Sequence, residues 1–424
     1  MACSGIITAA FSLHARSSPD SLIIVKEITI QGNETTKDHV ILREMSLKIG
    51  DPITPEAIER DRDRIYSLQL FNKVDIEPVT RGNGVTLLVQ VHERWYLFPF
   101  PVLGIRYRDV KKFFYGAGLA HQNFRGRNEK LFLSFALGYD RWVSLVYQNP
   151  KMTDDDDIFF RGSIAYQEVH NLSVNSGEYE QTNFAGGVNV GRRFGLYQTL
   201  FGFLNYDVWM VSDPQVGRTA STSGRDGFFS LGVQYSYDTR NIREYPTEGI
   251  LVSLGGTKSG FGESEVNLMT YAYDARAYLL LSEEWSLGVR SFGATVGGGV
   301  TPPYRRLFFG YDERIRGYFT DVLEGERFFG GNIELRFPVF NPRYLEVPIP
   351  IPQFNILRYG LYAGVFADAG KIWYRGESFS SKRWLSGVGA GLHFLLPYSL
   401  VVRTEYAWND LGQGKLVLDF GASF

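Results

Sequence analysis

Alternation of apolar and polar residues is the feature that most constrains this chain, and it runs from Trp95 to Phe424. In residues 229–238 every odd position is apolar or aromatic, and every even position is small or polar. The pattern recurs in 332–337 and 402–408, where the polar positions include Glu and Arg. Successive side chains of a β-strand point to opposite faces, so the pattern predicts strands with one apolar and one polar face. About 16 segments of roughly 10 residues repeat it.

The charges on the polar face favour a membrane barrel over a soluble sandwich. The polar face is charged in strand after strand while the apolar face is aromatic towards its ends, as expected when one side lines a lumen and the other meets lipid. No run approaches the roughly 18 to 20 apolar residues that a membrane-spanning helix needs. The last residues share one parity, typical of a strand that sorts a barrel to the outer membrane: Leu416, Leu418, Phe420, Ala422 and Phe424. We therefore predict a mainly β fold, a transmembrane antiparallel β-barrel of about 16 strands over residues 95–424.

Composition argues against several other classes of function. Lys and Arg together number 44 against 46 Asp and Glu, so the chain has no basic field for a nucleic-acid backbone. The single cysteine, Cys3, allows neither an intramolecular disulfide nor a cysteine metal knuckle, and the six histidines form no zinc-binding motif. No serine, histidine and acid set has the spacing of a hydrolase. We expect no nucleic-acid partner, no metal, no cofactor and no enzymatic activity.

Residues 21–94 follow a mixed pattern instead. It predicts a strand, two helices and a hairpin, over 23–30, 37–47, 55–68, 74–79 and 85–91 in turn. Thr54 before Pro55 is a typical helix start, and Gly82-Asn83-Gly84 is a hairpin signal. The order βααββ predicts one small α+β domain whose helices cover one face of a three-stranded sheet. The apolar run before Ala15 predicts a secretory leader over residues 1–20.

Short motifs in both parts give the chain a family resemblance. The first part carries Ile30-Gln31-Gly32-Asn33 and Leu70-Phe71-Asn72-Lys73-Val74, and the second carries Asp238-Thr239-Arg240-Asn241, Ile315-Arg316-Gly317-Tyr318, Glu334-Leu335-Arg336-Phe337-Pro338 and Phe366-Ala367-Asp368-Ala369-Gly370. With these motifs the chain resembles the outer-membrane assembly-factor superfamily typified by BamA and TamA. The resemblance implies one polypeptide-transport-associated (POTRA) domain at 21–94 in the periplasm, followed by a 16-stranded barrel in the outer membrane of a Gram-negative bacterium.

The parity of two barrel segments predicts a charged contact inside the lumen. Asp368 shares its face with the aromatics and glycines of 362–370, so its carboxylate points into the lumen, as does that of Glu334. A loop folded into the barrel would bring Arg316 to both acids, in charge-assisted bonds shielded from water. The glycine-rich strand 387–391 leaves room for that loop. We name the predicted set the lumen lock: Arg316, Gly317, Tyr318, Asp368 and Glu334.

Two strand edges are candidate binding surfaces for another extended chain. Helices leave one edge of the small sheet open, and an open edge is a template for strand addition. Its candidate client-binding residues are Ile23, Val25, Ile28 and Ile30.

In the barrel, the first strand, 97–109, is expected to pair with the last, 416–424. Two prolines in the first strand lack N–H donors and fall on one side of it, which predicts a weakened seam. The seam residues are Pro99, Pro101, Gly421 and Phe424. Alternatively, the prolines straighten the segment that enters the barrel.

One main hypothesis and two alternatives follow. The main one is a factor that inserts barrel proteins or translocates polypeptides at the outer membrane, with the POTRA domain receiving unfolded outer-membrane or exported polypeptides. Its other expected partners are outer-membrane lipids and accessory periplasmic proteins. A dedicated two-partner-type secretion pore is one alternative, although such a protein normally brings a plug helix and a second POTRA domain. A passive pore or adhesin is the other, and it would need no periplasmic receiving domain.

Overall fold

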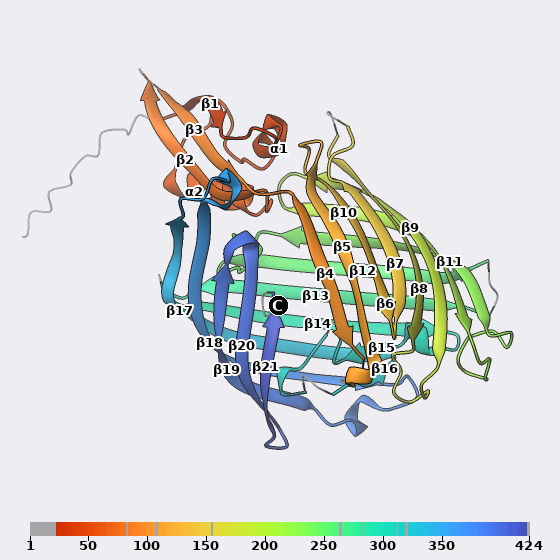
Figure 1. Cartoon of the computed structure of the whole chain (residues 1–424). Helices are drawn as coiled ribbons and strands as arrows, with labels where there is room; N and C mark the ends of the chain where they lie inside the picture. Colours follow the sequence, from red (N-terminus) through yellow and green to blue (C-terminus); the bar gives the residue numbers. More distant parts are fainter. Residues whose placement is uncertain are drawn as a thin grey trace, which may run out of the picture.

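The computed structural model describes residues 23–421, except 82–83, 107–108, 154–155, 263–264, 283, 312 and 319–320. The predicted leader, residues 1–20, and the seam residue Phe424 lie outside the described residues. A small N-terminal domain sits at one end of a large curled sheet (Figure 1). No helix of the described part of the chain is long and apolar enough to cross a membrane.

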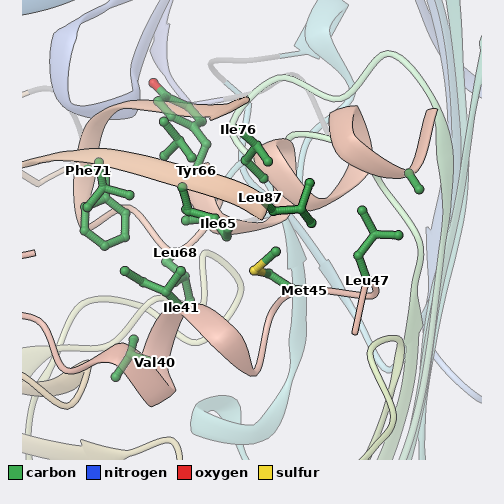
Figure 2. Close-up of a cluster of buried hydrophobic side chains, with 14 of the residues drawn as sticks. Val40, Ile41, Met45, Leu47, Ile65, Tyr66, Leu68, Phe71, Ile76 and Leu87 are labelled. Carbon is green, nitrogen blue, oxygen red and sulfur yellow. The ribbon is translucent and has the colours of Figure 1, made fainter. Parts of the chain in front are cut away.

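The N-terminal domain has the predicted order βααββ. Its elements are β1 (Val25–Gln31), α1 (Asp38–Leu42), α2 (Pro55–Tyr66), β2 (Phe71–Arg81) and β3 (Gly84–Glu93). The sheet order is β1-β3-β2, with β1 parallel and β2 antiparallel to β3. Thr54 caps α2 by accepting a hydrogen bond from the Ala57 amide at 3.2 Å, as the sequence predicted. Apolar side chains from both helices and the sheet form one core (Figure 2).

Helix α1 is shorter than predicted, ending at Leu42 rather than at Leu47. The buried carboxylate of Asp61, on α2, accepts from the backbone amides of Ser46 at 2.7 Å and Leu47 at 3.0 Å. These amides are satisfied by a side chain instead of by helical carbonyls, so the chain leaves the helical path before them.

The second part is an antiparallel sheet of 16 strands, which confirms the predicted fold class. The strands are β4 (Leu97–Ile105), β5 (Phe113–Phe124), β6 (Glu129–Gly138), β7 (Arg141–Asn149), β8 (Ile158–His170), β9 (Glu180–Phe194), β10 (Gln198–Val211), β11 (Arg225–Asp238), β12 (Gly249–Phe261), β13 (Leu268–Leu280), β14 (Ser286–Gly298), β17 (Arg327–Glu346), β18 (Ile356–Trp373), β19 (Leu385–Leu396), β20 (Leu400–Asn409) and β21 (Gly414–Phe420). The alternation separates the two faces: Val233 on the outer face is 52% exposed, whereas Ser230 on the inner face is 2% exposed.

A long connection, residues 299–326, joins β14 to β17 and folds back into the barrel. It contains the two-stranded sheet of β15 (Leu307–Phe309) and β16 (Leu323–Gly325) and the short helices η2 (Pro303–Arg305) and η3 (Arg316–Tyr318). Helix η3 packs against β19, β20 and β21. The remaining short helices lie in other connections: η1 (Val110–Lys112), η4 (Pro352–Phe354), η5 (Phe379–Ser381) and η6 (Pro397–Ser399).

The sheet has two free edges, β4 and β21, which are not hydrogen-bonded to each other within the described residues. The expected pairing of first and last strands is therefore wrong for this structure. The first strand is also shorter than predicted, because Arg106 donates to the Lys112 carbonyl at 2.9 Å and the chain turns there. Figure 1 shows the two edge strands at the front of the curled sheet.

The N-terminal domain is docked on the barrel end that carries the shorter turns. Glu44 forms ion pairs with Arg64 of α2 at 3.0 Å and with Arg193 of β9 at 2.6 Å. Farther round the rim, Arg94 donates to the Ser399 hydroxyl at 2.9 Å. Burial alone would raise the pKa of Glu44, but its hydrogen bond to Arg193 and the nearby arginine charges lower the pKa to about 2. The ionised carboxylate therefore stabilises the docked arrangement.

Candidate functional site

The inserted connection places Arg316 against Asp368 of β18. Arg316 Nε donates to Asp368 Oδ2 at 2.8 Å, and Nη2 donates to Oδ1 at 2.7 Å. The backbone amide of Arg316 donates to the same Oδ2 at 3.0 Å. The pair is thus bidentate and also fixes the backbone of η3, which is the geometry that a guanidinium and a carboxylate favour.

The same guanidinium reaches two further carboxylates. Its Nη1 donates to Glu334 Oε2 of β17 and to Glu405 Oε1 of β20, the latter at 3.1 Å. The centroid of the Phe366 ring lies 3.5 Å from the guanidinium carbon. Arg316 is 6% exposed and both glutamates are 0% exposed, so these charges are shielded from bulk water.

Glu334 and Glu405 connect Arg316 to a wider network. Arg336 donates to Glu334 Oε1 at 2.6 Å and to the Pro246 carbonyl at 3.0 Å, which reaches the turn between β11 and β12. His393 lies 3.1 Å from Glu405 Oε1, and its other ring nitrogen lies 2.7 Å from the Tyr245 hydroxyl of the same turn. The network therefore links the inserted connection to the opposite end of the barrel.

Glu334, His393 and Glu405 present ligand atoms within 4.8 Å of one another, a spacing that would also suit a metal ion. Both glutamates, however, already accept from arginines, and His393 is held between Glu405 and Tyr245. Because these cations occupy the oxygens that a metal would need, we assign the cluster to side-chain ion pairing.

Gly317 and Tyr318 fit the inserted segment against the wall. A β-carbon on Gly317 would lie 2.9 Å from the Cα of Gly387, so only glycine permits this approach. The space expected at the glycine-rich strand is thus filled by η3. Tyr318 donates to Asp410 and accepts from Arg383 at 2.7 Å. These two bonds hold η3 to the connections at the barrel end opposite the N-terminal domain.

The structure therefore brings all five residues of the lumen lock together, and their functional role stays a prediction. Sequence reasoning missed Glu405, His393 and Arg403 as members of this cluster. Arg403 Nη1 lies 3.4 Å from both oxygens of Glu405. The signal was present, because these residues occupy the polar positions of β19 and β20.

Pro99 and Pro101 lie on the free edge of β4. Tyr96 accepts from the Gln122 amide at 2.8 Å, and Arg106 donates to Lys112, so the even-numbered residues of β4 bond to β5. Alternate residues of a strand direct their backbone groups to opposite sides. Both ring nitrogens therefore face away from β5, as predicted for the seam.

Gly421 corrects the predicted seam set. Its amide donates to the Val401 carbonyl at 2.8 Å, so it belongs to the ladder between β20 and β21. Alternation from this bond places the backbone groups of Leu416, Leu418 and Phe420 at the free edge of β21. The seam is accordingly marked by these residues and the two prolines.

The predicted client-binding edge is partly occupied. Val25 donates to the Asp51 carbonyl at 2.9 Å, its own carbonyl accepts from Gly50, and the Ile23 carbonyl accepts from Ile53. Since these groups are already paired with the connection between the helices, Ile23 and Val25 are not free for strand addition. Ile28 and Ile30 follow on the open part of β1, with side chains that pack partly on the core.

Two family models match this chain. The model described as the Omp85 superfamily domain covers residues 123–424, and the POTRA model, described as a surface antigen variable number repeat, covers residues 23–94. The N-terminal domain is therefore called the POTRA domain below.

Relatives and a solved structure support the same assignment. The chain is 23% identical over 309 residues to outer membrane protein assembly factor BamA of Nitratidesulfovibrio vulgaris, covering 70% of this chain and 38% of that one. It is 26% identical over 414 residues to the BamA of Neorickettsia risticii, covering 92% and 53%. It thus spans about half the length of these relatives or less. The crystal structure of BamA from Haemophilus ducreyi lacking POTRA domains 1-3 has the same fold, with a TM-score of 0.56, 18% identity and coverage of 94% of this chain and 83% of that one. The chain belongs to the Omp85 superfamily.

Proposed function

We propose that this chain inserts β-barrel proteins into the outer membrane of a Gram-negative bacterium, or translocates polypeptides across it. The observation that carries the proposal is the open seam between β4 and β21. An unpaired strand edge is a template for another extended chain, and here it opens directly to the membrane. Membership of the Omp85 superfamily, and relatives named as assembly factors, support the same function.

The POTRA domain and the shorter turns face the periplasm in this proposal, and the 299–326 connection lies on the outer side. The exposed apolar residues of the outer face then meet lipid, which makes outer-membrane lipids a partner of the whole wall. Unfolded outer-membrane or exported polypeptides are received on the open part of β1, at Ile28 and Ile30, and accessory periplasmic proteins act on the same domain.

The two edges of the seam differ in the number of backbone N–H donors that are free to bond a client strand. β21 presents the amides of Leu416, Leu418 and Phe420 along its free edge, whereas Pro99 and Pro101 remove two donors from β4. β21 is also braced from inside, because Arg314 and Asp321 of the inserted connection pair with Asp419 at 3.3 Å and Lys415 at 3.0 Å. The client strand therefore pairs with β21, while β4 moves aside.

In this proposal the lumen lock keeps the strands away from the seam in fixed positions while the seam opens. Arg316 joins β17, β18 and β20 through one guanidinium, so these strands keep their relative positions when the seam parts. The inserted connection and the POTRA domain also fill or cover parts of the lumen, an arrangement that is unfavourable for a passive pore.

Depletion of the protein in its native host, followed by proteomics of the outer membrane, tests the function. General loss of barrel proteins supports insertion, and loss of a single protein would instead indicate dedicated secretion. An unchanged proteome would refute both and leave the pore or adhesin. Deleting residues 22–92 sharpens the result: a barrel that folds but handles no client assigns reception to the POTRA domain, whereas unchanged client assembly would remove that role.

A further inference from the structure

A groove runs across the outer face of the barrel on the wall opposite the seam. It has a volume of about 760 Å³ and is lined by residues of β10 to β14, β17 and β18. Its axis follows one row of cross-strand neighbours: Val233, Gly256, Tyr271, Thr295, Arg327 and Trp373. The volume falls in the range of small-molecule sites.

Glycines opposite tyrosines create the groove. A β-carbon on Gly256 would lie 3.5 Å from the Tyr271 ring, and one on Gly293 would lie 2.8 Å from the Tyr273 ring. Because glycine has no side chain, each tyrosine ring packs over the glycine opposite it on the neighbouring strand and does not project between bulky side chains. Tyr271 and Leu254 are still 53% and 51% exposed, so the floor is a wide apolar surface. Such a surface favours a hydrocarbon chain.

A cation without an acidic partner among the described residues lies near one end of the row, next to Trp373. Arg327 has no acidic partner among the residues that the structure describes, and its buried Nε meets no hydrogen-bond acceptor. Its cross-strand neighbours, Thr295 and Trp373, carry no charge. By contrast, Arg375 nearby pairs with Glu326 at 2.9 Å. An unpaired guanidinium on an apolar, membrane-facing wall is unfavourable unless an anion meets it.

The position of Arg327 suits a lipid headgroup. It begins β17 at the barrel end opposite the POTRA domain, where the 299–326 connection returns to the wall. Beside it, Trp373 packs edge-to-face against Phe379, and Phe379 packs edge-to-face against Trp384. Aromatic rings of this kind concentrate at the headgroup level of a membrane. The cation thus stands at the headgroup level while the tyrosine-covered floor lies deeper.

We propose that this groove binds one anionic lipid of the outer leaflet. Its acyl chain lies along the floor over Gly256, and a phosphate of its headgroup accepts hydrogen bonds from the Arg327 guanidinium. The proposal rests on the proposed membrane location but not on any insertion activity. A lipid bound there further stabilises the wall opposite the seam, which keeps its position while the seam opens.

Native mass spectrometry of the full chain, released from micelles with added phosphatidylglycerol or phosphatidylcholine, tests the site. We expect one retained phosphatidylglycerol and no matching phosphatidylcholine. Arg327→Gln should weaken retention by roughly tenfold or more, because a charge-assisted bond is lost. Gly256→Leu, which fills the floor without a close contact at its β-carbon, should also weaken retention of phosphatidylglycerol, because the acyl chain then loses its place on the floor.

Lys111→Gln is the matched control, since it removes one exposed positive charge at the same end of the barrel but beside β5. Equal retention of the two lipids by the unaltered protein, or equal losses in Arg327→Gln and Lys111→Gln, would overturn the site. The readout is binding alone, so a protein that holds the lipid but inserts no client would refute only the proposed function.

Discussion

Replacing Arg316 with alanine removes the cation that three buried carboxylates share. Glu334 keeps Arg336, and Glu405 keeps His393 and Arg403. Asp368 keeps no cation among the residues that the structure describes, because the only guanidinium bonded to it there is that of Arg316. The variant therefore leaves one buried carboxylate, 3% exposed, without its counter-charge.

The expected decrease in the free energy of unfolding follows from the loss of this one counter-charge. Removing one partner of a buried ion pair destabilises a protein by about 3–5 kcal/mol, whereas an exposed pair contributes about 0–1 kcal/mol. Arg192→Ala is the matched control, because Arg192 and Asp156 are 56% and 49% exposed and lie 3.5 Å apart. We expect Arg316→Ala to lower the free energy of unfolding by about 3–5 kcal/mol. Asp368→Asn keeps the size of the side chain and should cost less, about 1–3 kcal/mol.

Urea unfolding of the protein folded in liposomes, with gel heat-modifiability as a second probe, measures both variants. Adding Asp368→Ala to Arg316→Ala should recover part of the loss, since no unpaired charge then remains. If Arg316→Ala unfolded within about 1 kcal/mol of the Arg192→Ala control, the inserted pair would not stabilise the barrel, and the lock would be refuted.

Three further predictions concern the fit of the loop, the docking of the POTRA domain and the seam. Gly317→Ala should expose the 299–326 connection to protease, because its β-carbon would meet the Gly387 backbone; an unchanged digestion pattern would contradict this. Glu44 has a pKa lowered from 4.5 to about 2, so its contribution to docking is complete above pH 4.5 and is lost as the pH falls through about 2. The protection of the α1 amides, measured as the exchange rate relative to the intrinsic rate at the same pH, should therefore fall only in that window, and a fall near pH 6 would argue against this origin. Replacing Pro99 and Pro101 with valine restores two donors at the β4 edge and should slow client insertion in liposomes; an unchanged insertion rate would sink the seam proposal.

The fold class and most element positions were open to prediction because they depend on local patterns. Alternation placed the strands of the barrel, and the capping Thr54 located the start of α2. The same parity put Asp368 and Glu334 on one face. Predictions from local patterns were wrong where a group from another segment makes the hydrogen bonds. The Asp61 carboxylate binds the amides of residues 46 and 47, so α1 ends early, and residues 50–53 pair with the start of the β1 edge.

The sequence by itself determined which side chains face inward, because the period of a strand is set by its backbone. It did not determine which inward residues meet, since that depends on register and on where a loop docks. Glu405 joins Arg316 only because β20 lies near β18 in the sheet and η3 packs against β19, the strand between them. The open seam is likewise a tertiary result: prolines predict missing donors, but whether the edges pair is decided by the curvature of the whole barrel.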